Sequence, residues 1–275
     1  SQWDGIASSI EGLGLDEILD ETNLDWNVAR VPLFMKNGDE LLEVPRKRAL
    51  IRDTDNRVFD IVSDTWNEVQ HRDALKTFME IADKGKMVLD RAGAFNDGQF
   101  IWAQARINKE VEIVKGDVIK AYLLMSVPHK FGQSYAFGQT QTRVSCENSL
   151  AHALGGDNIF KFNHSKTFDH EHIMAVVTKI SDDLEKLKES GSFLSRKNYT
   201  PEELTNYLRE VFPIENAKKL EESRAASICR DIMETQPGGE FARGTWWQAF
   251  NAVTFYQDHL AGNDNDKRLY SSWFG

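Results

Sequence analysis

Strand signals fill the first half of this chain and helix signals fill the second half, and this order restricts the possible folds most. Apolar and polar residues alternate along residues 99–107 and 135–144, and residues 118–127 are apolar enough for a central strand. From residue 146 onward, the apolar spacing is helical almost to the end. Strands followed by helices predict an α+β fold rather than a doubly wound parallel sheet. We expect an antiparallel β-sheet core in the N-terminal half, with packed helices and a helical C-terminal half.

Turn and capping signals give the expected boundaries. The run Asp53-Thr54-Asp55-Asn56-Arg57 predicts a hairpin between strands 49–51 and 58–62, and Asn96-Asp97-Gly98 predicts a second hairpin before residue 99. Residues 26–35 are expected to be extended, and helices are expected at 13–21, 73–88, 147–154, 169–190, 201–211, 215–235 and 245–261. The domain prediction is an acidic N-terminal segment (1–23), a strand-rich core (24–155) and a helical region (156–275) packed on that core as one structural unit.

The net charge of -10 is concentrated near the N-terminus. Residues 1–45 contain ten acids but only Arg30 and Lys36 as bases, a balance of -8, which leaves -2 for the remaining 230 residues. Residues 100–145 contain six bases and three acids, a balance of +3. The middle of the chain is therefore suited to face an anion, although the whole chain is acidic.

Bulk features predict a cytoplasmic protein. No apolar stretch approaches the length of a membrane span, and no basic segment followed by an apolar run marks the N-terminus. Cys146 and Cys229 are too few for a disulfide framework or an all-cysteine zinc site, and are expected to stay reduced. We expect no membrane association.

The sequence lacks the common enzyme signatures. It contains neither a G-x-x-x-x-G-K-[ST] nor a G-x-G-x-x-G phosphate loop, and no G-x-S-x-G elbow. In the cluster His164, His170 and His172, the last two are two residues apart and would diverge on a helix. We therefore predict no catalytic residue, cofactor or metal. A metal-dependent hydrolase or nuclease using His164, Asp258 or His259 stays open as an alternative.

The last expected helix carries two stripes. Trp246, Phe250, Val253 and Leu260 form one, and Trp247, Asn251, Thr254 and Asp258 form a second, mixed one. The mixed stripe either bonds neighbouring backbone inside the core or lines a groove.

Aromatic and cationic residues on the expected strands suggest a partner. Aromatic rings stack on unpaired bases, and Arg and Lys follow phosphates. The predicted contacts for single-stranded DNA are Trp102, Arg106, Lys120, Tyr122, Tyr135 and Arg143. The alternative is that these aromatic side chains pack beneath helices.

Two sequence blocks carry a family resemblance. Thr142 to Leu150 and Gly244 to His259, together with Ala92-Gly93, Gly98 to Trp102 and His164, resemble a family of phage- and plasmid-borne proteins known as domain of unknown function 932. The matching motif positions are Arg143, Cys146, Asn148, Trp246, Asn251, Thr254 and Asp258. The resemblance implies a mobile-element protein in a bacterial cytoplasm, and it transfers no catalytic residues.

Two functions follow as hypotheses. The strand-rich core with a packed helix is similar in layout to single-strand annealing proteins, so the first is a self-associating protein that anneals or protects single-stranded DNA. The second is an interaction protein that binds a host or phage partner through its acidic N-terminal segment.

Overall fold

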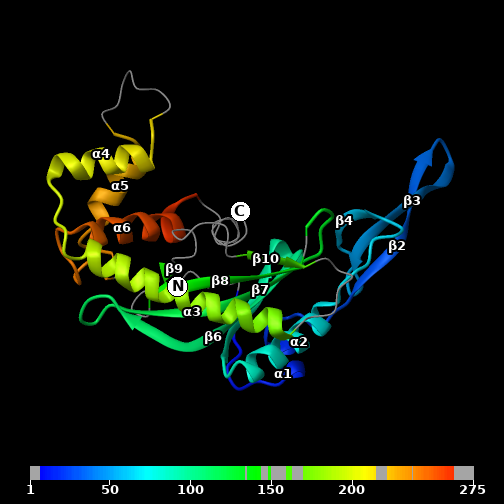
Figure 1. Ribbon diagram of the computed structural model, residues 1–275. Helices are drawn as coiled ribbons and strands as arrows, with labels where there is room; N and C mark the ends of the chain where they lie inside the picture. Colours follow the sequence, from blue (N-terminus) through cyan, green and yellow to red (C-terminus); the bar gives the residue numbers. More distant parts are fainter. Residues whose placement is uncertain are drawn as a thin grey trace.

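The computed structural model describes residues 7–133, 135–143, 148–149, 159–162, 170–214, 222–236 and 238–262. It has the predicted α+β architecture, with most strands before most helices. Figure 1 shows a main sheet in the middle, a small sheet projecting from one end, and helices α4, α5 and α6 at the other end.

The main sheet is antiparallel and has seven strands. Its order is β1-β5-β6-β7-β8-β10, with β9 paired to β8. The strands are β1 (Ala7–Ser9), β5 (Val88–Phe95), β6 (Phe100–Glu112), β7 (Val118–Pro128), β8 (Tyr135–Arg143), β9 (Asn148–Ser149) and β10 (Ile159–Phe162). Because β7 lies between β6 and β8, the prediction of a central strand at 118–127 is confirmed.

The turn between β5 and β6 is the predicted one. Asn96, Asp97 and Gly98 all have positive φ, of 49°, 53° and 95°. Glycine adopts this region without strain and Asn and Asp tolerate it better than most residues, which explains their use here. A Cβ at Gly98 would lie 2.9 Å from Trp26, so the turn also approaches a neighbouring ring closely.

Helices cover one face of the main sheet. α1 (Leu15–Glu21), α2 (His71–Lys84) and the long α3 (His170–Leu194) correspond to three predicted helices. Phe78 of α2 and Leu184 of α3 lie in the same core cluster as Ala103 of β6 and Leu123 of β7. This helix-covered face therefore contains the main hydrophobic core.

The small sheet has three strands: β2 (Val28–Asn37), β3 (Glu40–Arg52) and β4 (Val58–Ser63), in that order. The predicted extended segment at 26–35 and the hairpin around 53–57 are both confirmed. The sequence did not predict that these strands form a separate sheet, or that β3 begins as early as Glu40. Its inner residues Leu50 and Val62 are fully buried in the main core and fix the small sheet to the rest of the protein.

The C-terminal helices form a second core. α4 (Pro201–Val211), α5 (Arg224–Ile232), α6 (Trp246–Phe255) and a π-helical turn (Tyr256–Leu260) follow α3. α4 has the predicted bounds, and Thr200 caps it, because its hydroxyl accepts from the Glu203 amide at 3.2 Å. Leu208, Cys229 and Ala252 lie in this smaller cluster.

Two expectations beyond residue 146 are wrong. Residues 148–149, expected to be helical, pair with β8 as strand β9, and residues 159–162 pair with the other end of β8 as β10. Hydrogen bonding to β8 overrides the local helical spacing here. Residues 150–154 of that expected helix and residues 215–221 of a later one lie outside the described residues. No helix in the described ranges is long and apolar enough to cross a membrane.

Candidate nucleic-acid interface

Four of the six predicted DNA contacts lie together. Arg106 of β6 pairs directly with Tyr122 of β7, and Trp102 of β6 pairs with Ser126. Since side chains alternate along a strand, Trp102 and Arg106 share a face, and Tyr122 and Lys120 of β7 share it with them. We call this the cationic face; it is opposite the helix-covered face.

The other two predicted contacts are elsewhere. Tyr135 belongs to the main core with Phe137, whose ring centroid is 5.2 Å away in an edge-on arrangement. Burial also raises the pKa of the Tyr135 hydroxyl. Arg143 pairs with Ile119 in the backbone register of β7 and β8, and its side chain is outside the described part of the structure.

The aromatic members of the set are buried. Trp102 is 0% exposed, Tyr122 8% and Tyr135 3%. The Trp102 ring stacks on Phe95 at 5.8 Å. All three rings are therefore buried and offer little surface for a base, but only Tyr135 lies in the helix-covered core, as the alternative expected. Their predicted role in stacking stays a prediction.

The cations reach the surface instead. Arg106 and Lys120 are half-buried, as is Arg91 of β5, which pairs with Gln104 of β6. Lys130 is exposed and its Nζ lies 5.9 Å from the centroid of Phe100, a ring of the same face. The strand pattern did not indicate Arg91 or Lys130. Arg91 precedes the alternating segment at 99–107, and Lys130 follows the apolar segment at 118–127.

Three carboxylates among the described residues moderate the charge of the cationic face, and one of them, Glu112, pairs directly with Val118, which shares the face of Lys120. Glu110 pairs directly with Lys120 across β6 and β7. Asp90 accepts a hydrogen bond of 2.6 Å from the Gln104 side chain. Counted over the described residues, four cations and three carboxylates leave this face with a small positive charge in a protein whose net charge is -10.

A second surface, missed by the sequence analysis, is apolar. Phe34, Met35, Leu41 and Leu42 lie on the outer part of the β2–β3 hairpin and are all exposed, Leu41 by 71%. Val58 and Ile61 on β4 are exposed too. These short apolar runs look like ordinary core strands in the sequence, so nothing in their pattern distinguishes an exposed sheet. Clustered exposed apolar residues are typical of binding surfaces.

Buried rings join the two sheets. Trp26 lies 4.3 Å from His71, and the Arg52 guanidinium lies 5.4 Å from the Trp26 ring centroid. His71 Nε2 donates to the Leu24 carbonyl at 2.7 Å, and burial lowers the pKa of His71. The neutral His71 ring is therefore one of the buried groups that pack between the two sheets.

The acids of the turn at 53–57 hold the local structure through hydrogen bonds. Asp55 accepts two hydrogen bonds from Arg52, at 2.9 and 2.7 Å, and these bonds lower the pKa of Asp55 to about 2. Asp53 accepts from the Asn27 amide at 2.9 Å, which lowers the pKa of its carboxyl.

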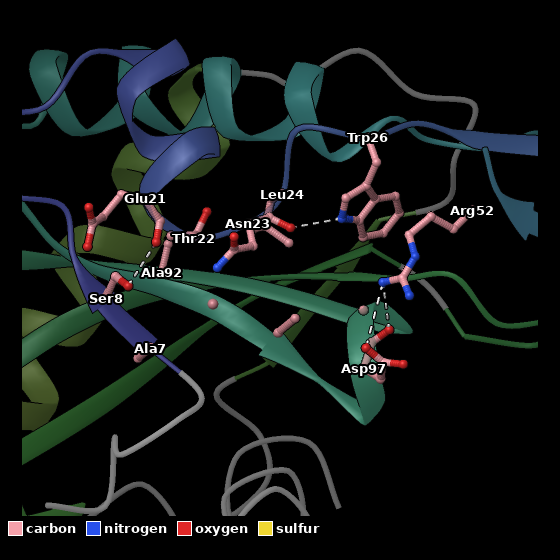
Figure 2. Close-up of a pocket in the computed structure, with 13 residues that line it drawn as sticks. Ala7, Ser8, Glu21, Thr22, Asn23, Leu24, Trp26, Arg52, Ala92 and Asp97 are labelled. Atoms are coloured by element: carbon pink, nitrogen blue, oxygen red, sulfur yellow. Dashed lines mark hydrogen bonds and ion pairs between the residues drawn. The ribbon is translucent and has the colours of Figure 1, made fainter. Parts of the chain in front are cut away.

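A pocket of about 590 Å³ opens at the junction of the two sheets. Figure 2 shows Trp26 and Arg52 at one side of it and Ser8 and Glu21 at the other. Arg52 is held there by Asp55 and by the Asp97 carbonyl, 3.3 Å from its Nη1. The volume of this pocket is in the range of small-molecule sites, but the polar lining of the pocket is less typical of such sites.

The family-motif positions in α6 are structural. Trp246 packs edge-on against Tyr199 at 5.6 Å. Asn251 and Thr254 are buried, and the Thr254 hydroxyl donates to the Asn251 carbonyl at 3.0 Å. The part of the mixed stripe whose side chains the structure describes, Trp247, Asn251 and Thr254, thus faces the core, as one of its two interpretations predicted.

The neighbouring Trp247 connects α6 to the main sheet: its Nε1 donates to Asp117, just before β7, at 2.7 Å. Asn148 lies in β9, whereas Cys146 and the side chain of Asp258 are outside the described residues.

The described ranges contain no group of three or more His, Cys, Asp or Glu that could hold a metal. His164 and the side chains of His170 and His172 lie outside those ranges. The His259 ring stacks on Phe255 at 4.5 Å.

Comparison with known proteins gives one match. A family described as "Domain of unknown function (DUF932)" matches residues 58–273. This range includes all four cations of the cationic face, while β2 and β3 precede it. Neither the curated proteins nor the solved structures include a match to the chain.

Proposed function

Since this chain belongs to the DUF932 family, a domain of unknown function, we propose a function from its own geometry: it binds single-stranded DNA across the cationic face. The observation that supports this most is the register of β5, β6 and β7, which gathers Arg91, Arg106 and Lys120 on one face. The helices of the main core pack on the opposite face, and the inner residues of the cationic face, such as Trp102 and Leu124, are buried as well, so the half-buried cations are the part of this face that reaches the surface.

The proposed mechanism relies on charge more than on stacking. Arg91, Arg106, Lys120 and Lys130 contact phosphates, and displaced counterions favour binding. Since the rings beneath them are buried, the bases stay free to pair with a complementary strand. This is what a protein that anneals or protects single strands requires, and replication and recombination are common tasks of mobile elements, the setting that the resemblance implies.

The test is fluorescence anisotropy of a labelled single-stranded oligonucleotide, with duplex as competitor. Arg106→Gln and Lys120→Gln should each weaken binding several-fold, on the order of 1 kcal/mol for a phosphate contact. Glu110→Gln should strengthen it, because it removes the carboxylate opposite Lys120. Lys76→Gln is the matched control, since Lys76 is exposed on α2 on the other side of the sheet. No binding at low salt, or equal loss in the control, would refute the proposal.

A second candidate function is binding of a host or phage protein, and the exposed apolar residues of the small sheet favour it. The acidic segment expected to bind a partner partly coincides with this sheet, because β2 lies within residues 1–45. Deleting residues 1–45 is a poor test: Ile10, Ile18 and Leu19 of that segment lie in the main core. Leu41→Ser is the better variant. It should keep the fold but lose crosslinking to a captured partner protein.

A further inference from the structure

The outer part of the β2–β3 hairpin, residues 32–48, projects away from the rest of the protein (Figure 1). We call it the arm. Its middle carries exposed apolar side chains on both strands: Met35 pairs with Leu42, while Phe34 pairs with Glu43 and Leu41 pairs with Lys36. Phe34, Met35 and Leu41 are 54%, 52% and 71% exposed. Such a surface is costly to leave in water and indicates an interface.

The acidic residues of the arm lie toward its end and most of its basic residues toward its base; exposed Lys36 lies near the end, and Glu43 lies between the two and pairs with Arg48 at 3.0 Å. Asp39 and Glu40 form an acidic tip next to Gly38, and all three are exposed. Arg46 and Lys47 form a basic root, and both are exposed. The apolar middle lies between them. Lys47 is seven positions beyond Glu40, about 23 Å along an extended strand, so tip and root are well apart.

The arm also contains an edge strand of the small sheet, β2. The small sheet has the order β2-β3-β4, and β2 pairs with β3 only among the described strands. An apolar edge strand offers its outward N–H and C=O groups to another strand, a common route to association between chains.

We propose that the arm binds the arm of a second copy of this chain, antiparallel and about a two-fold axis. Two identical arms in this arrangement place each acidic tip on the partner's basic root and bury the apolar middles against each other. A parallel arrangement would pair acid with acid and base with base. Self-complementarity of one patch is what an isologous dimer requires. This interface is separate from the cationic face, so it does not depend on DNA binding.

The experiment is sedimentation equilibrium of the full chain without DNA, over a range of concentrations. The wild type should dimerise. A root variant (Arg46→Glu with Lys47→Glu) and a tip variant (Asp39→Lys with Glu40→Lys) should each be monomeric, with a dimer Kd raised at least about tenfold by like-charge contacts. An equimolar mixture of the two should dimerise again, because the reversed tip then meets the reversed root. The matched control, Lys76→Glu with Lys84→Glu on exposed positions of α2, should behave as the wild type.

Leu41→Ser is a second test, because so exposed a side chain can be replaced with little effect on the fold. It should weaken the dimer while circular dichroism and thermal unfolding stay unchanged. A monomeric wild type, charge-reversal variants that still dimerise, or a mixture that stays monomeric would each overturn the proposal. Capture of a different protein by the arm, with no self-association, would also overturn it.

Discussion

Trp102→Ala should destabilise the protein and leave the DNA affinity of the folded molecules nearly unchanged. Trp102 is 0% exposed and stacks on Phe95 at 5.8 Å. A buried tryptophan removes about 150–250 Å² from water, which at about 25 cal/mol per Å² is worth roughly 4–6 kcal/mol as an upper estimate. Measured losses for Trp→Ala in cores are about 3–5 kcal/mol. We therefore expect a loss of about 3–5 kcal/mol in the free energy of unfolding.

Urea unfolding followed by circular dichroism measures that loss, and anisotropy at low urea concentration measures affinity. Phe34→Ala is the matched control. Phe34 is also an aromatic residue on a strand, but its side chain is 54% exposed, so its replacement should lower the free energy of unfolding by about 0.5 kcal/mol or less. If Trp102→Ala were as stable as the wild type yet bound DNA much more weakly, the ring would be a DNA contact. The argument from burial would then be wrong.

Three further variants test separate parts of the structure. Thr200→Ala removes the acceptor for the Glu203 amide and should cost about 1 kcal/mol in urea unfolding. Asp117→Ala removes the acceptor of the buried Trp247 N–H and should cost about 1–3 kcal/mol; a double-mutant cycle with Trp247→Phe should show coupling, and additive losses would contradict the bond. Burial lowers the pKa of His71, so the unfolded chain binds its proton more readily and stability should fall as pH drops below about 6.5. His71→Phe should flatten this fall between about pH 8 and pH 5.5, and an unchanged slope would contradict a neutral buried imidazole.

Local patterns predicted much of the fold because they depend on near neighbours in the sequence. Alternation along β6 gave the face on which Trp102 and Arg106 lie together. Turn chemistry predicted Asn96-Asp97-Gly98, and capping chemistry predicted the start of α4 at Thr200. Each of these features needs only a few adjacent residues, so a single sequence contains the required information.

Features that depend on distant contacts were not predicted. The strands β9 and β10 form because β8 offers them a hydrogen-bonding edge; a helix was expected over 147–154, and no strand was expected at 159–162. The sequence left open whether Trp102 and Tyr122 are buried, since alternation assigns a face and not its exposure. The arm was missed for the same reason: the pattern of Phe34 and Leu41 is that of a core strand, and only the tertiary structure leaves it uncovered.

The most direct test of the proposed function is the salt dependence of single-stranded DNA binding. If the four cations of the cationic face each contact a phosphate, log K should fall with log salt concentration with a slope of about -3. Arg106→Gln should reduce the magnitude of that slope by about 0.7, and the control Lys76→Gln should leave it unchanged. A slope near zero, or one that is the same in wild type and Arg106→Gln, would contradict binding through this face.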